Sequence, residues 1–170
     1  MIRLLVPDTE MELQAMEFKR QFYENGEHTI CGSYKLDQER YTYAEWLAII
    51  KSNRSRETAN PKFGVSDTFF AATDDGTLVG IINIRYDQTP FYKDSGNIGY
   101  SVIPCHRKKG YATEMLRSVL ELAKLHGLSE VKLVCASENI ASKKTIIKCG
   151  GKLLRVFGDE KMKEEYIIYL

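Results

Sequence analysis

The chain has 170 residues, 44% hydrophobic and 28% charged, which is enough for one domain with a buried core over residues 1–170. The formal net charge of +1 excludes a general electrostatic attraction to nucleic acid or to an anionic membrane surface, so any anion site is local. The four cysteines form no Cys-x-x-Cys pair, and no histidine lies at metal-ligand spacing from one of them. We therefore predict free cysteines, no metal site and no disulfide framework.

The periodicity of apolar residues predicts strands and helices in mixed order. Strands are expected over residues 2–6, 68–73, 77–86, 97–103, 130–136, 152–157 and 162–169, and helices over 11–23, 41–50, 110–126 and 140–148. The polar stretch 51–67 is long for a connection between two elements. It is interpreted either as a binding loop or as a plain surface linker. No apolar run approaches the ~18 residues of a membrane span, and the first residues lack the apolar core of a signal peptide. These features predict a cytoplasmic α/β protein with neither a membrane nor a nucleic acid as partner.

The stretch 97–112 joins a strand to a helix through a basic loop that contains a glycine. Pro104 cannot donate a hydrogen bond to a sheet, so the strand is expected to end there. From Ala112 to Ala123 the apolar residues recur with a helical period. The first N–H groups of that helix have no partner inside it and carry the positive end of its dipole. Residues 107–112 therefore suit a phosphate or pyrophosphate, with an ordinary strand–helix turn as the alternative.

Two motifs in the right order resemble those of the GNAT superfamily of acyl-CoA-dependent N-acetyltransferases. Arg-Lys-Lys-Gly-Tyr-Ala at 107–112 resembles the acetyl-CoA pyrophosphate loop of that family. Asn-Ile-Ala-Ser at 139–142, with Lys-Cys-Gly-Gly at 148–151, resembles its second CoA-contacting helix. The resemblance covers about residues 68–157 and is strongest to a bacterial subfamily without a known acceptor. It implies an α/β fold with a mixed, mostly antiparallel sheet of about seven strands, flanked by about four helices.

The resemblance also implies which residues bind acetyl-CoA, the expected co-substrate. Backbone N–H groups of residues 108–112 would hold the pyrophosphate, and the backbone at 102–103 would pair with the pantetheine arm as an added strand. Asn139 would hydrogen-bond that arm, unless it serves only as a helix cap. One of two lysines would reach the 3′-phosphate, and the other would be solvated. The implied set is Val102, Ile103, Arg107, Lys108, Lys109, Gly110, Tyr111, Ala112, Thr113, Asn139, Ser142, Lys143 and Lys148.

The sequence departs from the family at both common catalytic positions. Many members have a tyrosine acting as general acid seven residues after the helix asparagine, where this chain has Ile146. Related enzymes often start the strand with a glutamate, where this chain has Asn97. The remaining candidates for proton transfer are Tyr100, His106, Glu138 and Tyr166. A nucleophilic pair of adjacent Cys105 and His106 is disfavoured, because neighbouring residues of an extended segment point in opposite directions.

By this resemblance we expect an N-acetyltransferase that moves an acetyl group from acetyl-CoA to an amine by direct transfer in a ternary complex. The acceptor is a small molecule or a peptide, and Asp67, Asp87 and Asp94 are candidates for its surroundings. A non-catalytic acyl-CoA-binding or sensing module is the alternative, because both usual catalytic residues are missing. A homodimer is a further open prediction, formed by pairing residues 166–170 at a sheet edge.

Overall fold

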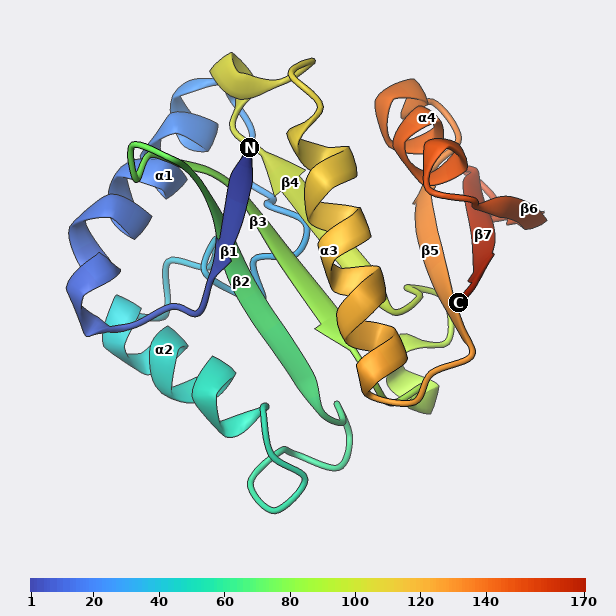
Figure 1. The fold of residues 1–170 in the computed structure, drawn as a ribbon, viewed down its shortest axis with the longest axis horizontal. Coiled ribbons are helices and arrows are strands. Elements are labelled where there is room, and N and C mark those ends of the chain that lie inside the picture. Colours follow the sequence, from blue (N-terminus) through green and yellow to red (C-terminus); the bar gives the residue numbers. More distant parts are fainter.

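The computed structural model describes residues 1–170 as two antiparallel sheets covered by four α-helices (Figure 1). The larger sheet has the order β1-β2-β3-β4, with strands Ile2–Leu5, Ser66–Thr73, Leu78–Arg85 and Ile98–Val102. The smaller sheet has the order β5-β7-β6, with strands Glu130–Ala136 (β5), Lys152–Phe157 (β6) and Lys163–Tyr169 (β7). The helices are α1 Glu12–Glu24, α2 Tyr43–Ser52, α3 Tyr111–Leu125 and α4 Ile140–Lys148. The predicted seven strands and four helices are confirmed, although they form two sheets rather than one.

Local signals explain where several elements begin. Thr42 and Glu45 form a capping box at the start of α2, which satisfies two otherwise free backbone donors. The Asn139 side chain accepts from the Ser142 N–H at 3.0 Å and caps α4. Strand β2 starts two residues before its predicted start, because Ser66 pairs with the last residue of β3. The connection after α2 is correspondingly shorter than expected.

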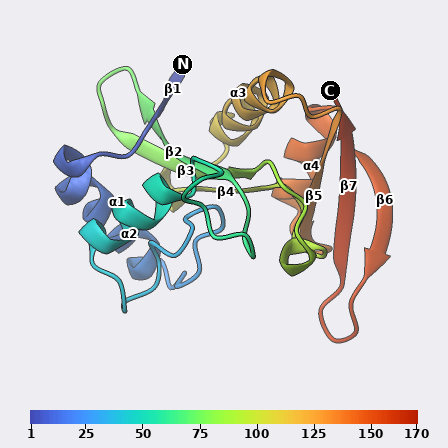
Figure 2. The same cartoon turned by 90° about the horizontal axis from the view of Figure 1, so that it is seen from below.

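Helices α1 and α2 cover one face of the larger sheet, and α3 covers the other (Figures 1 and 2). Alternating side chains of β2 supply both layers, since successive residues of a strand point to opposite faces. Phe70 packs with Trp46 on the α1–α2 side, and Phe69 packs with Leu116 of α3 on the other. Helix α4 contributes Ile146 to the α3 side, where both sheets share one core. None of the four helices has the length and hydrophobicity needed to cross a membrane.

The two sheets meet at one point and separate beyond it. Gly96 forms an isolated bridge with Leu133, and the Asn97 N–H donates to the Lys132 carbonyl at 2.6 Å. Beyond this joint β4 and β5 are not hydrogen-bonded partners, so each is the inner edge of its own sheet. The view from below shows the gap between β4 and β5 (Figure 2). On this side β4 therefore has no partner strand, which is the arrangement in which an extended ligand can add to a sheet edge.

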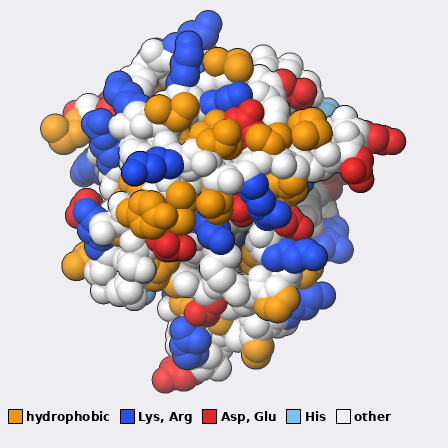
Figure 3. Space-filling view, turned by 90° about the vertical axis from the view of Figure 1, so that its right-hand side faces the viewer, with side chains coloured by type: hydrophobic (Ala, Val, Ile, Leu, Met, Phe, Trp, Pro, Cys, Tyr) orange, Lys and Arg blue, Asp and Glu red, His pale blue; other side chains and the backbone are white.

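The C-terminal strand does not lie at a sheet edge, contrary to the sequence-based expectation for residues 166–170. Strand β7 runs between β5 and β6 and pairs with both, so its backbone has no free side. The outer edge of this sheet is β6, whose Leu153, Leu154 and Val156 are about half exposed. Figure 3 shows hydrophobic side chains interspersed with lysine and arginine on this side of the molecule. A second chain that adds a strand here would meet β6 and not β7.

Candidate active site

The loop from residue 107 to residue 112 presents a row of unpaired backbone donors. The N–H groups of residues 108–112 donate no hydrogen bond within the chain. Lys108 and Gly110 have φ values of 64° and 88°, in the left-handed region, and Gly110 directly precedes α3. Left-handed residues in a loop can turn successive N–H groups toward one concave site, which favours an anion. No atom lies within 4 Å of the position that a Cβ of Gly110 would take, so the site is open.

The side chain of Arg107, the first residue of this loop, is engaged in contacts within the protein. Its two Nη atoms bind the Glu27 carboxylate at 2.8 and 2.6 Å, and its Nε donates to the Val102 carbonyl at 3.1 Å. This ion pair holds the pKa of Glu27 below its ordinary value. From the sequence, Arg107 was expected to be a free cation that could bind a pyrophosphate. In the structure it is not free, because it is paired with Glu27. It instead fixes the loop to the segment that follows α1.

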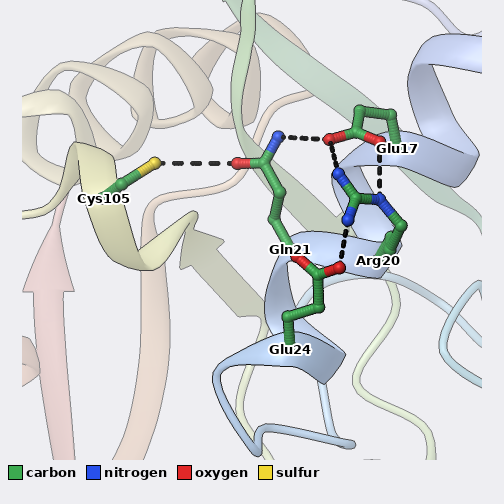
Figure 4. Close-up of polar contacts among 5 residues, drawn as sticks. All are labelled: Glu17, Arg20, Gln21, Glu24 and Cys105. Carbon is green, nitrogen blue, oxygen red and sulfur yellow. Dashed lines mark hydrogen bonds and ion pairs between the residues drawn. The ribbon is translucent and has the colours of Figure 1, made fainter.

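Helix α1 also anchors the turn just before this loop (Figure 4). The Cys105 thiol lies 3.6 Å from Gln21 Oε1, and Gln21 in turn donates to Glu17 at 3.0 Å. Cys105 thus points at α1, and a nucleophilic pair with His106 is not formed. The His106 Nδ1 is buried without a hydrogen-bond partner. None of the polar contacts in the structure brings His106 to the gap between the sheets.

The register of β3 and β4 decides which backbone groups face the gap. The Arg85 N–H donates to Asn97 and the Ile103 N–H donates to Val79, so odd-numbered residues of β4 bond to β3. In an antiparallel pair the intervening residues point their N–H and C=O groups the other way. Tyr100 therefore presents its N–H and C=O to the gap, whereas Val102 presents only a free N–H, because its carbonyl accepts from Arg107.

Ile103 does not fit the expected pairing with pantetheine. Its N–H is used by β3, its carbonyl accepts from the His106 N–H at 2.9 Å, and its side chain is buried between the sheet and α1–α2. Thr113 is also largely buried, at 8% exposure, on the core side of the first turn of α3. The remaining loop residues Lys108, Lys109, Tyr111 and Ala112 are exposed or half-buried.

Tyr100 crosses the gap from β4 to α4. Its hydroxyl lies 3.0 Å from the Ser142 Oγ in the first turn of α4. Burial raises the pKa of Tyr100 to about 12, so the hydroxyl keeps its proton at neutral pH. Ile146, at the common position of the acid, is 1% exposed and belongs to the core. A protonated donor thus lies in this region, but it comes from the strand instead of the helix.

The other candidates for proton transfer are either exposed or already hydrogen-bonded. Glu138 is exposed and forms no ion pair. Tyr166 is 3% exposed and donates to the Glu164 carboxylate on the same strand, and burial raises its pKa. Asn97 is 2% exposed, and its amide joins the two sheets, so it is a structural residue.

The two lysines expected near the 3′-phosphate differ in what they contact. Lys143 Nζ binds Glu164 at 2.8 Å and the Ser137 carbonyl at 3.3 Å. Lys148 forms no ion pair and lines a cavity of about 540 Å³ between α3, α4 and the end of β7. Arg117 of α3 lines the same cavity and is a cation that the sequence analysis missed. Its place on a solvated helix face gave no local signal.

The three aspartates expected near an acceptor are all paired. Asp67 binds Arg54 Nε at 2.6 Å and the Tyr86 hydroxyl at 2.8 Å. Asp87 binds Arg56 at 2.9 Å, and Asp94 binds Arg155 at 2.8 Å across to β6. They fasten loops around the far end of the sheet and leave no free carboxylate for an amine. No group of three or more His, Cys, Asp or Glu side chains comes together as a metal site.

Comparisons with known proteins agree with this architecture. Residues 4–152 match the family described as acetyltransferase (GNAT) domain. The structure is similar to the microcin C7 self-immunity acetyltransferase MccE in complex with acetyl-CoA and AMP, with a TM-score of 0.72, 16% identity, and 99% of this chain and 92% of that chain covered. It is similar to Mycobacterium smegmatis RimJ in complex with CoA-disulfide, with a TM-score of 0.71, 18% identity, and 99% and 81% covered.

A third similar structure is the GNAT-family acetyltransferase from Streptococcus pneumoniae, with a TM-score of 0.70, 19% identity, and 100% of this chain and 99% of that chain covered. No curated protein matches the sequence. The family match spans most of the chain, including the unpaired donors of residues 108–112 and the gap beside β4. The chain belongs to the GNAT acetyltransferase family.

Proposed function

We propose that the protein is an N-acetyltransferase that uses acetyl-CoA and transfers the acetyl group directly to an amine in a ternary complex. The row of five unpaired N–H groups at residues 108–112 carries this proposal, because it fits a pyrophosphate. Acetyl-CoA, when bound, supplies an acyl group activated as a thioester. The backbone groups of Tyr100 and the N–H of Val102 would pair with the pantetheine arm, and an N–H would stabilise negative charge on the thioester oxygen.

Tyr100 is the proposed proton donor to the leaving sulfur. A thiolate has a pKa near 8.5, so it needs less help from an acid than an alkoxide would. The raised pKa of Tyr100 keeps the donor protonated over the whole working range of the enzyme. Ser142, 3.0 Å away, orients the hydroxyl. The attacking amine must be neutral, and its proton leaves to water, since Asp67, Asp87 and Asp94 are all engaged in ion pairs.

The same structure supports further parts of the proposal. Lys148 and Arg117 are the proposed contacts of the 3′-phosphate, because Lys143 is engaged by Glu164. A cytoplasmic location is supported by four free cysteines, two of them exposed, since exposed thiols persist in reducing compartments. The proposed partner is a small-molecule or peptide amine.

The experiment combines binding and turnover. Acetyl-CoA, CoA and ATP are titrated calorimetrically into the unmodified protein and into Gly110→Glu, whose carboxylate would repel a pyrophosphate. We expect both CoA species, but not ATP, to bind the unmodified protein and to lose most of their affinity in the variant. Absence of CoA binding to the unmodified protein would remove the basis of the proposal. Binding without turnover of any amine would favour the non-catalytic sensing module.

Tyr100→Phe separates catalysis from binding. We expect kcat to fall about 10- to 100-fold, at the lower end for general acid catalysis because the leaving thiolate is stable. Acetyl-CoA affinity should remain within about twofold. Tyr41→Phe, in the loop before α2, is the matched control, because Tyr41 makes its contacts to Lys35 and Arg40 through the ring, and it should leave both unchanged. Full activity of Tyr100→Phe would exclude this residue as the donor.

A further inference from the structure

Arg85, the last residue of β3, is a half-buried cation without a carboxylate partner. Its Nε and Nη2 donate to the Gly96 carbonyl at 3.1 and 2.9 Å, and Nη2 also reaches the Ser95 carbonyl at 3.3 Å. Its Nη1 lies 3.3 Å from the Asn83 Oδ1. All four contacts are to neutral groups. Since a guanidinium has five N–H donors, one Nη1 proton remains without an acceptor.

Arg85 is the one arginine that is not exposed and yet has no carboxylate partner, since Arg3, Arg40 and Arg117, which also lack one, are exposed. Salt bridges to aspartate or glutamate are formed by Arg20, Arg54, Arg56, Arg107 and Arg155. Arg85 is half-buried, and this burial lowers its pKa, although a guanidinium still stays charged. A cation held away from water by neutral dipoles alone is unfavourable unless an anion completes its surroundings. The missing anion is the first sign of a binding site.

A second unpaired donor lies in the same cluster. Asn53, at the end of α2, is 4% exposed, and its Nδ2 has no hydrogen-bond partner. Its side chain lies beside the Tyr34 hydroxyl, which also lies near Tyr92 and Arg85. The Arg85 guanidinium stacks on the Tyr92 ring, 4.5 Å from the ring centroid. Three separate segments thus bring donors and aromatic rings together around one point.

The loop between α1 and α2 is held in an unusual conformation at this cluster. Tyr34 and Lys35 are consecutive non-glycine residues with φ values of 48° and 78°. Such residues cost free energy and persist where the surrounding structure requires them, often at ligand sites. The Lys35 ammonium lies over the Tyr34 ring, 5.6 Å from its centroid, and adds a second positive charge. The nearest acid of this loop, Asp37, is engaged by the Ile30 N–H and the Ser33 hydroxyl.

The cluster lies close to the proposed reaction centre. Asn83, which contacts Arg85, is the register partner of Gly99, the neighbour of Tyr100 on β4. Arg85 is two residues further along the same face of β3, about 7 Å by strand geometry. Gly32 packs so closely on Gly99 that a Cβ there would lie 2.2 Å from the Gly99 carbonyl oxygen. The loop that carries Tyr34 therefore lies directly against the strand that borders the gap.

We propose that the amine acceptor carries an oxyanion, a carboxylate or a phosphate, which binds between Arg85 and Asn53 while its amine reaches the gap beside Tyr100. This inference rests on the proposed function for the claim that the ligand is an amine. The anion site itself stands on the unpaired donors. Arg85 is then a specificity-determining residue, because it selects acceptors with an anion a few ångströms from the nucleophilic nitrogen. Amines without a negative group would leave the guanidinium uncompensated.

The test compares amines that differ only by the anionic group. Tyrosine with tyramine and arginine with agmatine probe a carboxylate, and phosphoethanolamine with ethanolamine probes a phosphate. We expect kcat/KM for the anionic member of at least one pair to exceed that of its neutral match by 10-fold or more. In Arg85→Gln this ratio should fall close to one, whereas Arg85→Lys should keep part of it. The control is Arg40→Gln, in the loop between α1 and α2. Arg40 is an exposed cation that stacks on Tyr41, and its removal should leave the full ratio of kcat/KM values.

Binding measurements separate this inference from the proposed function. The same pairs are titrated calorimetrically into the protein saturated with CoA, and acetyl-CoA affinity of each variant reports whether its fold is intact. Preferential binding of an anionic member that Arg85→Gln abolishes would support the anion site even if no amine were acetylated. The anion site would be overturned if both members of every pair were acetylated with the same kcat/KM and if Arg85→Gln did not change that ratio. The proposed acetyltransferase function would still hold in that case. No discrimination in either turnover or binding would also overturn the anion site.

Discussion

Replacing Asn97 by alanine tests the joint that holds the two sheets together. The Asn97 amide accepts from the Lys132 N–H at 2.8 Å and donates to the Arg85 carbonyl at 2.9 Å, so it links β5 to β3. Alanine keeps the backbone bonds of residue 97, but it leaves one N–H and one C=O without these partners. Because Asn97 is only 2% exposed, water does not readily replace the amide.

The expected cost follows from the two groups left unpaired. Each buried group without a partner costs about 1–3 kcal/mol. A cavity of about 270 Å³ borders the joint and is lined by Asn97 and Lys132, so some water can enter once the amide is gone. We therefore expect the lower part of the range, a total loss of about 2–3 kcal/mol in the free energy of unfolding. With a urea m-value of about 2 kcal/mol/M, the midpoint should fall by about 1–1.5 M.

Urea unfolding followed by circular dichroism measures this change, with the m-value required to stay constant. Asn25→Ala is the matched control, because that asparagine is exposed and hydrogen-bonds only the neighbouring Glu27 side chain through its amide, at 2.7 Å. The control should change stability by less than about 0.5 kcal/mol. An equally small change for Asn97→Ala would refute the reasoning, since the amide would then not join the sheets. A normal fold with lost turnover would instead indicate a direct role in catalysis.

Three further predictions concern charged residues around the site. Glu27→Gln releases Arg107 from its partner and should raise the KM for acetyl-CoA about two- to fivefold, as expected for a half-exposed pair of about 0.5–1 kcal/mol. Lys143→Met removes the ion-pair partner of Glu164, which keeps only the hydrogen bond from Tyr166, and should lower the melting temperature at pH 7. Because Lys143 lowers the pKa of Glu164, this difference should be full above the ordinary pKa of about 4.3 and be lost as pH falls from there through the lowered pKa of the folded protein. Lys148→Gln should weaken CoA about three- to tenfold, while calorimetry with dephospho-CoA should show no change.

Much of the site was predictable because its signals are local. Strand β5, helix α4 and strand β6 have the predicted bounds residue for residue. The loop at residues 107–112 could be identified from a proline that ends a strand, a glycine and a helical period. Hydrogen bonding within one segment determines all of these features, so the sequence of that segment was sufficient.

Long-range pairing could not be predicted in the same way. Arg107 looked like a free cation because Glu27 lies 80 positions away in the sequence. The side of β4 that faces the gap depends on its register with β3, so the sequence did not distinguish Val102 from Ile103. The unpaired state of Arg85 is likewise a property of three segments that meet only in the fold. Such features depend on which distant segments pack against each other in the fold. The periodicity of the sequence carries no information on that packing.

The placement of the proton donor leads to one last prediction. Ile146, where many relatives have a tyrosine, packs so closely on Gly151 that a Cβ there would lie 2.4 Å from its Cγ2. A tyrosine at this position would overpack the core at a cost of about 1–3 kcal/mol and would not reach the gap. Ile146→Tyr is therefore expected to lower stability and to leave the kcat of Tyr100→Phe unrestored, as measured with the best amine of the panel. If the double variant instead recovered activity, the helix position would reach the sulfur, and the acid would not have to come from β4.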